Sequence, residues 1–186
     1  FHGTGNKPVR RILAELGFKH VYVVPEQERP DPAFTTLDYP NPEDPKAFTL
    51  ALKLAKKVDA DIVLATDPDA DRVGIAMKCP DGSYELVTGN EMGVLLLDYI
   101  CAGRKELGTL PEKAVAVKSI VSTPLADAVA AHYGVEMRSV LTGFKWIGDQ
   151  IASLEAAGEV DRFIFGFEES YGCLLYTSPS PRDLST

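Results

Sequence analysis

Three aspartates stand at alternate positions in the stretch from Thr66 to Arg72. They are Asp67, Asp69 and Asp71, and they follow the nearly all-apolar run 61–65, which is typical of a buried strand inside an α/β sheet. Carboxylates this close together repel one another, so they favour a divalent cation between them. Oxygen ligands suit magnesium, manganese or calcium better than zinc. We therefore expect an oxygen-ligated metal site, its three side chains pointing the same way from an extended loop.

Arg72 follows the third aspartate directly. A guanidinium group can hold a phosphate oxygen through two hydrogen bonds while a neighbouring metal ion holds another oxygen. The combination of three carboxylates and one arginine therefore indicates phosphoryl chemistry.

Three other interpretations of this acidic loop can be compared with its spacing. An EF-hand loop requires Gly at its sixth position and Glu at its twelfth, where Arg72 and Lys78 stand. Haloacid-dehalogenase-like phosphatases also place Asp-x-Asp after an apolar strand, but they usually continue with Thr or Val where Asp71 stands. A solvated charged turn is not expected directly after a buried strand. The phosphatase stays open as a minor alternative.

A second polar loop, Gly166 to Gly172, follows another apolar run. Sugar hydroxyls both donate and accept hydrogen bonds. A protein carboxylate and a protein hydroxyl side by side can therefore bind two neighbouring sugar hydroxyls. Glu168 and Ser170 are the expected contacts. Glu169, between them in the sequence, is expected to point away and to support the loop.

Three weaker candidates lie at predicted turns and strand ends. Gly143, which follows Thr142, would let the backbone approach a ligand closely, and Lys145 could bind a phosphate. A turn followed by a helix cap explains these residues equally well. Lys118 ends a predicted strand. His2 belongs to a glycine-rich turn that lacks P-loop spacing, and it either faces the site or is a structural turn residue.

In order and spacing, these motifs resemble those of the α-D-phosphohexomutases. Asp67 to Arg72 resembles the family's Asp-x-Asp-x-Asp-Arg metal loop, and Gly166 to Ser170 resembles its Gly-x-Glu-Glu-Ser sugar loop. The turn His2-Gly3-Thr4-Gly5 resembles the phosphoglucomutase/phosphopentomutase branch. The likeness covers about residues 1–174. It implies magnesium on Asp67, Asp69 and Asp71, and a phosphate or transition-state contact from Arg72. It also implies substrate contacts from Thr142, Gly143, Lys145, Glu168 and Ser170. Weaker substrate contacts are implied for His2 and Lys118.

The resemblance also implies a mechanism. An enzyme phosphoserine would pass its phosphoryl group to a sugar phosphate, giving a sugar bisphosphate. This bisphosphate would be both the intermediate and the primer of the reaction. The overall reaction would interconvert a sugar 1-phosphate and its 6-phosphate, or a pentose 1-phosphate and its 5-phosphate. That serine belongs to another domain in the family, so this chain is expected to be an inactive fragment. Phosphomannomutase-type specificity and a non-catalytic module that binds magnesium and phosphosugar remain alternatives.

Strand and helix patterns alternate along the chain, which predicts an α/β fold of two consecutive three-layer α/β/α domains with mixed sheets. Helices are expected near residues 7–16, 44–58, 89–103, 122–134 and 145–157, and strands near 21–24, 61–65, 73–77, 84–87, 114–117, 135–140 and 162–167. Ligands of such folds bind at the carboxyl ends of strands. The acidic loop and the sugar loop are therefore expected to line one cleft.

The predicted domains are residues 1–104 and 105–174, joined by a polar linker at 103–112. By resemblance they are the second and third of four domains, with the first strand of the second domain missing before Phe1. Residues 175–186 are rich in Ser and Pro and are expected to be a non-native tail.

Bulk composition excludes several classes of protein. No apolar run approaches the roughly 20 residues that span a bilayer, and no signal peptide opens the chain. Three widely separated cysteines suggest neither zinc nor a disulfide framework, which fits the cytoplasm. A net charge of -8 argues against nucleic acid as a partner, so a phosphosugar is the expected ligand.

Overall fold

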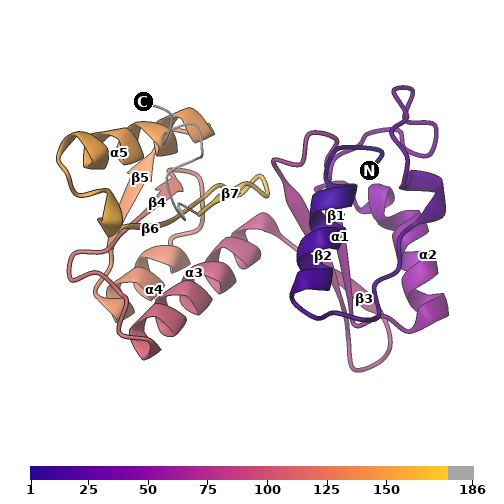
Figure 1. The fold of residues 1–186 in the computed structure, drawn as a ribbon, viewed down its shortest axis with the longest axis horizontal. Helices are drawn as coiled ribbons and strands as arrows, with labels where there is room; N and C mark the ends of the chain where they lie inside the picture. The colour runs from indigo at the N-terminus through magenta and orange to yellow at the C-terminus, as the bar shows by residue number, and fades with distance from the viewer. Residues whose placement is uncertain (176–186) are drawn as a thin grey trace. The chain divides into compact units, whose positions relative to one another are not determined.

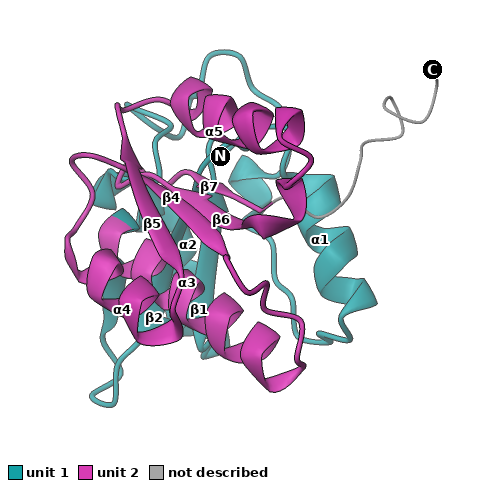
Figure 2. Cartoon of the chain, turned by 90° about the vertical axis from the view of Figure 1, so that its left-hand side faces the viewer, with its two compact units in different colours: residues 1–89 teal, residues 90–186 magenta. Residues whose placement is uncertain are grey.

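A computed structural model of the 186-residue chain describes residues 1–175. The chain forms two compact units: the first unit is residues 1–89, and the second unit begins at Asn90 (Figure 2). The predicted non-native tail lies outside the described residues from position 176 onward. None of the described helices is both long enough and apolar enough to cross a membrane.

The first unit contains two helices and one sheet (Figure 1). Its elements are the helix α1 (Asn6–Glu15), the 3-10 turns η1 (Pro25–Gln27) and η2 (Pro45–Phe48), the helix α2 (Thr49–Val58), and the strands β1 (Ile62–Thr66), β2 (Val73–Lys78) and β3 (Tyr84–Val87). The strands form an antiparallel sheet in the order β1-β2-β3. The predicted hairpin is confirmed: Gly82 has a φ of +82°, which favours glycine at the turn.

The core of the first unit lies between α2 and the sheet. Buried side chains of Phe48, Ala51 and Ala55 pack against Val63, Ala65 and Ala76. The small residues of α2 follow the apolar face that the sequence predicts, and they allow the helix to lie close to β1 and β2. This packing fixes the carboxyl end of β1, where the acidic loop begins.

Two expectations for the first unit are wrong. The run Val21 to Val24 is not a strand, because no strand of the described chain pairs with it, and the side chain of Tyr22 is 55% exposed. β1 is not a central strand either: it is an edge of the sheet, with Ile62 50% and Leu64 39% exposed. Both errors have one cause, since an apolar run reveals that burial is needed but not which strand will pair with it.

An apolar groove of about 390 Å³ runs beside the free edge of β1. Helix α1, the segment 18–24 and one face of α2 line it. Helix α1 buries none of its residues fully, and Ile12 is half exposed on it. The first unit therefore carries an apolar surface that the described residues do not cover.

The described part of the second unit contains a four-stranded sheet and three α-helices. Its elements are α3 (Gly89–Glu106), β4 (Val115–Ser119), α4 (Leu125–Tyr133), β5 (Glu136–Val140), α5 (Phe144–Ala156), the 3-10 turn η3 (Val160–Arg162), β6 (Phe163–Phe167) and β7 (Cys173–Leu174). The order is β5-β4-β6-β7, with β4 parallel to β5 and β6, and β7 antiparallel to β6. The predicted mixed sheet is confirmed in this unit.

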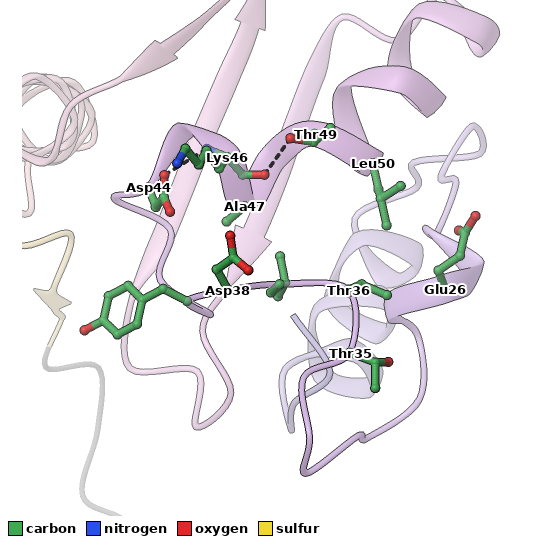
Figure 3. A pocket seen from close by; sticks show the side chains of 11 residues that line it. Glu26, Thr35, Thr36, Asp38, Asp44, Lys46, Ala47, Thr49 and Leu50 are labelled. Atoms are coloured by element: carbon green, nitrogen blue, oxygen red, sulfur yellow. Dashed lines mark hydrogen bonds between the residues drawn. The ribbon is translucent and has the colours of Figure 1, made fainter.

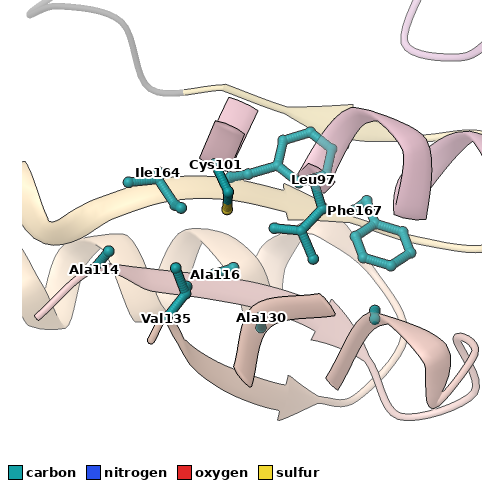
Figure 4. Packing of buried hydrophobic residues seen from close by; sticks show 10 residues of the cluster. Leu97, Cys101, Ala114, Ala116, Ala130, Val135, Ile164 and Phe167 are labelled. Carbon is teal, nitrogen blue, oxygen red and sulfur yellow. The ribbon is translucent and has the colours of Figure 1, made fainter. Parts of the chain in front are cut away.

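Helices cover both faces of this sheet. On one face, Leu97 and Cys101 of α3 and Ala130 of α4 pack with strand residues such as Ala116 and Phe167 (Figure 4). On the other face, Ile147, Ile151 and Leu154 of α5 pack against Val115, Val117 and Phe163. The predicted three-layer α/β/α arrangement is therefore present here.

The division between the units lies earlier than the boundary expected after residue 104. Helix α3 continues to Glu106, and its buried residues Leu97 and Cys101 belong to the core of the second unit. The basic residues Arg104 and Lys105, which suggested a linker, form the last turn of this helix, where positive charge interacts favourably with the helix dipole.

Candidate functional site

The acidic loop joins β1 to β2 in the first unit. Oxygen atoms of Asp67, Asp69 and Asp71 all lie within 4.8 Å of one another, so the predicted convergence of the carboxylates is observed. The loop is not extended as expected: Ala70 has a φ of +63°, and its N–H donates to the Asp67 carbonyl oxygen at 3.2 Å. A turn, rather than strand-like alternation, brings the three side chains together.

The electrostatics of the loop are those of a cation site. The side chain of Asp67 is buried while Asp69 and Asp71 are exposed. The pKa of Asp67 is raised to about 6, mainly by burial; a hydrogen bond from the Arg72 N–H at 3.0 Å opposes this increase, while Asp71 and Asp69 add to it. A divalent cation would relieve this cost, because it stabilises the charged form of all three carboxylates. An oxygen-only set of three carboxylates fits magnesium, which keeps water molecules on its remaining positions.

Arg72 lies against the same carboxylates. Its Nε atom is 3.3 Å from Asp67 Oδ2 and 3.7 Å from Asp71 Oδ1, and Nη1 is 3.7 Å from Glu43 Oε1. About one third of its side chain is exposed. The guanidinium group therefore offsets part of the negative charge and keeps donors available to a further anion.

The sugar loop follows β6 in the second unit. Glu168 is buried, and its carboxylate accepts a hydrogen bond from the N–H of Gly143. The Glu168 N–H donates to the Gly172 carbonyl oxygen at 2.9 Å, which closes the loop before β7 returns along β6. The structure thus brings together two of the predicted substrate loops, and the Glu168 carboxylate is the link between them.

Glu169 points to the end of β4, as expected for a supporting residue. Its Oε2 atom accepts hydrogen bonds from Ser119 Oγ at 2.5 Å and Ser122 Oγ at 3.2 Å, and the two serine hydroxyls are 2.7 Å apart. Both serines are buried. Sequence reasoning did not find this role for them, because a serine at the end of a strand and another in the turn after it have no distinctive spacing.

Ser170 is half-buried, and within residues 1–175 no side-chain hydrogen bond to it is found. Thr142 and Lys145 are exposed beside the start of α5, and Lys145 Nζ lies 5.3 Å from the centre of the Trp146 ring. Gly143 has a φ of +119°, which requires glycine. The side chains of Ser170, Thr142 and Lys145 are therefore available to a ligand of the second unit.

The two weaker candidates are engaged internally. Lys118 is buried, with Nζ 3.2 Å from both the Ser122 carbonyl oxygen and Asp127 Oδ2. His2 is 5% exposed, with Nδ1 2.9 Å from the Arg29 carbonyl oxygen and Nε2 2.7 Å from Thr36 Oγ1. Both side chains therefore have structural partners where the sequence suggested substrate contacts.

The first unit also contains a pocket of about 650 Å³ that no motif predicted (Figure 3). Its wall includes the turn in which Asp44 accepts from the Lys46 N–H at 2.9 Å and Thr49 donates to the Lys46 carbonyl oxygen at 2.6 Å. It is lined by Glu26, Thr35, Thr36, Leu37, Asp38, Tyr39, Asp44, Lys46, Ala47, Thr49 and Leu50. Carboxylates, hydroxyls and one amine share this surface.

Comparison with known proteins gives matches over both units. The family model described as phosphoglucomutase/phosphomannomutase, alpha/beta/alpha domain II, matches residues 1–82, and that described as domain III matches residues 88–183. A phosphoglucomutase of Staphylococcus epidermidis is 42% identical over 173 residues, which are 93% of this chain and 30% of that protein. The chain thus spans about a third of the length of this curated relative.

Solved structures share the fold. A phosphoglucomutase/phosphomannomutase family protein from Burkholderia thailandensis has a TM-score of 0.70 at 20% identity, over 94% of this chain and 33% of that one. The N-acetylphosphoglucosamine mutase of Aspergillus fumigatus, solved with GlcNAc-6P and magnesium, has a TM-score of 0.57 at 15% identity, over 97% of this chain and 38% of that one. At these identities the likeness shows the fold alone.

Proposed function

Because the chain belongs to the phosphoglucomutase/phosphomannomutase family, we propose that the whole protein is a magnesium-dependent phosphosugar mutase. It interconverts a sugar 1-phosphate with the 6-phosphate, or a pentose 1-phosphate with the 5-phosphate. The observation that carries the proposal is the convergence of three carboxylates at the end of β1 in a chain that matches the family over both units.

In this proposal Asp67, Asp69 and Asp71 hold the magnesium ion. When bound, the ion supplies positive charge that stabilises the phosphoryl group during transfer. Arg72 adds a second positive charge from a fixed position beside Asp67, and its free N–H groups donate to a phosphate oxygen. The acidic loop therefore acts by positioning and electrostatics rather than by providing a nucleophile.

The second unit binds the sugar. The Glu168 carboxylate, oriented by the Gly143 N–H, accepts from one sugar hydroxyl, and the Ser170 hydroxyl bonds to a neighbouring one. Thr142 and Gly143 contact the same ligand, and the exposed ammonium group of Lys145 pairs with a phosphate. Lys118 and His2, whose polar atoms are engaged internally, support the fold instead.

The proposed reaction has two transfers. A serine phosphate elsewhere in the whole protein gives its phosphoryl group to a sugar hydroxyl, so one oxygen–phosphorus bond forms, the serine–phosphate bond breaks, and the hydroxyl proton ends on the serine oxygen. The resulting sugar bisphosphate then returns its other phosphoryl group to the serine. The same bisphosphate can prime an unphosphorylated enzyme. Because covalent catalysis requires its nucleophile, the 186-residue chain by itself is expected to be inactive.

Phosphomannomutase-type specificity remains the second candidate, since the matching family includes both activities in its name. In isolation, this chain would act as the alternative predicted from the sequence, a non-catalytic module that binds magnesium and phosphosugar. The family match over both units favours a mutase over the haloacid-dehalogenase-like phosphatase. We assign the reaction to the cytoplasm, because all three cysteines of the chain are free thiols, which a reducing compartment preserves.

A chimera tests the proposal. Replacing the matching segment of the S. epidermidis phosphoglucomutase with this chain should give an enzyme that converts glucose 1-phosphate only in the presence of magnesium and a bisphosphate primer. Mannose 1-phosphate and ribose 1-phosphate, assayed alongside, determine specificity.

In the chimera, Ser170→Ala should weaken substrate binding by about 0.5–1.5 kcal/mol, the value of one neutral hydrogen bond.

The isolated chain is the control. It should show no mutase turnover and no hydrolysis of p-nitrophenyl phosphate, because in this proposal the phosphoryl-carrying serine lies elsewhere in the whole protein. Mutase turnover by the isolated chain, or a folded chimera without magnesium-dependent activity, would contradict the proposal.

A further inference from the structure

The first five residues of the chain lie directly against the acidic loop. The Phe1 nitrogen donates to the Thr66 carbonyl oxygen at 3.0 Å, and the Thr4 N–H donates to the Pro68 carbonyl oxygen at 2.8 Å. The Thr4 hydroxyl donates to the same Pro68 oxygen at 3.2 Å. These hydrogen bonds fix the backbone on both sides of Asp67 without involving any carboxylate.

Two glycines make this approach possible. A Cβ atom on Gly3 would lie 2.2 Å from the Pro68 carbonyl oxygen and 2.4 Å from its Cα atom. A Cβ atom on Gly5 would lie 2.4 Å from Thr66 Oγ1. The obstacles at Gly3 are backbone atoms, so a side chain there would have to displace the acidic loop or the turn itself.

The turn is held from its other side by residues that follow α1. The His2 N–H donates to the Gln27 carbonyl oxygen at 3.2 Å, and the two His2 ring nitrogens lie 2.9 Å from the Arg29 carbonyl oxygen and 2.7 Å from Thr36 Oγ1. Gln27 Nε2 donates to the same threonine hydroxyl at 3.3 Å. Anchored in this way, the turn cannot easily move away from the acidic loop.

We propose that the turn His2-Gly3-Thr4-Gly5 is a positioning element of the metal site, which sets the Pro68 backbone and through it the convergence of Asp67, Asp69 and Asp71. Only one of these carboxylates is buried, so side-chain packing alone does not hold the other two in place. His2 is accordingly a positioning residue and not a substrate contact. This inference rests on the proposed function.

The first test measures magnesium affinity of the chain by titration calorimetry, at a temperature where every variant is folded by circular dichroism. Gly3→Ala should weaken magnesium binding by about 10- to 100-fold, the range seen when groups that support metal ligands are changed. The matched control is Gly103→Ala, whose added methyl group meets no atom within 4 Å and which should bind magnesium as the parent chain does. Equal affinity in Gly3→Ala and the parent chain would overturn the inference.

Hydrogen exchange provides a readout that needs no metal. In Gly3→Ala the amides of residues 66–72 should exchange faster than in the parent chain, while those of the second unit should not change. If the parent chain binds no magnesium, the proposed role of Asp67, Asp69 and Asp71 as metal ligands is wrong. The exchange rates of residues 66–72 still determine whether the turn positions the acidic loop. Unchanged exchange at residues 66–72 would refute the positioning role.

Two milder variants cover the case in which Gly3→Ala does not fold. Thr4→Val removes only an exposed hydroxyl, so it should fold and should weaken magnesium binding by about two- to threefold, as expected for one lost weak hydrogen bond. His2→Asn should lower magnesium affinity and leave the KM for sugar phosphate in the chimera unchanged at saturating magnesium. A raised KM with unchanged magnesium affinity would instead make His2 a substrate contact.

Discussion

The Ser119 hydroxyl donates a 2.5 Å hydrogen bond to the carboxylate of Glu169, joining the end of β4 to the loop that follows β6. A second buried hydroxyl, that of Ser122, donates to the same oxygen at 3.2 Å. The two loops are 50 residues apart in the chain. Because the neighbouring residues Glu168 and Ser170 are the proposed sugar contacts, this connection fixes the backbone from which both project.

Replacing Glu169 by alanine should destabilise the chain by about 1–3 kcal/mol, because it leaves two buried serine hydroxyls without their acceptor. Urea unfolding followed by circular dichroism measures the change. Glu112→Ala makes the same chemical change at an exposed position and should have little effect. Similar losses for the two variants would show that the Glu169 connection contributes nothing.

Replacing Gly93 by alanine should destabilise the second unit. The added Cβ atom would lie 2.2 Å from Cδ2 of Phe167, in a core that has no room for it, and such overpacking typically costs about 1–3 kcal/mol. Gly103 lies on the same helix with nothing within 4 Å of the added atom. There the higher helix propensity of alanine should stabilise the protein by up to about 1 kcal/mol. Thermal unfolding distinguishes the two, and stabilisation in both would contradict the packing.

Replacing Asp69 by asparagine should weaken magnesium binding at least tenfold, because one of three charged ligands is lost. Without metal the same variant should have a slightly higher Tm than the parent chain, since repulsion among the carboxylates falls. Calorimetric titration and thermal unfolding give both readouts. Asp149→Asn, at an exposed position of α5, is the control for the change in net charge. Unchanged magnesium affinity in Asp69→Asn would exclude this residue as a ligand.

Cys101 and Cys173 should react slowly with iodoacetamide in the native chain. Burial raises the pKa of each thiol to about 11, so about one thousandth of each is the reactive thiolate at pH 8. The rate should rise about tenfold per pH unit up to the pKa, because thiolate accumulates as protons leave. Mass spectrometry of labelled peptides measures the rate, with the chain in urea as the fast reference. Cys101 is buried and Cys173 half-buried, so equal rates in the native chain and in urea would contradict the raised pKa of these thiols.

The parts of the fold that could be predicted from the sequence are those fixed by local signals. The helix expected near residues 145–157 is Phe144–Ala156, and the one expected near 7–16 is Asn6–Glu15, because glycines and the apolar period mark their limits. The pairing of strands is not a local property. Val21 to Val24 has every side-chain preference of a strand, yet no strand among the described residues pairs with it.

The candidate site shows the same division. The acidic loop could be recognised because its three ligands are adjacent in the sequence, although the left-handed turn at Ala70 that makes them converge could not. Lys118 resembled a phosphate contact at a strand end, and only the fold reveals the partner that occupies its ammonium group, Asp127. The link from Glu168 to Gly143 likewise depends on two loops that meet only after folding.

The free edge of β1 has a consequence for how the isolated chain behaves in solution. An apolar groove runs beside this edge, and a strand edge that no described strand pairs with is a template onto which a strand of another molecule can add. The half-exposed Ile62 would be covered by such an added strand. Aggregation of this chain at high concentration is therefore expected to start at β1, in spite of the repulsion that a net charge of -8 provides.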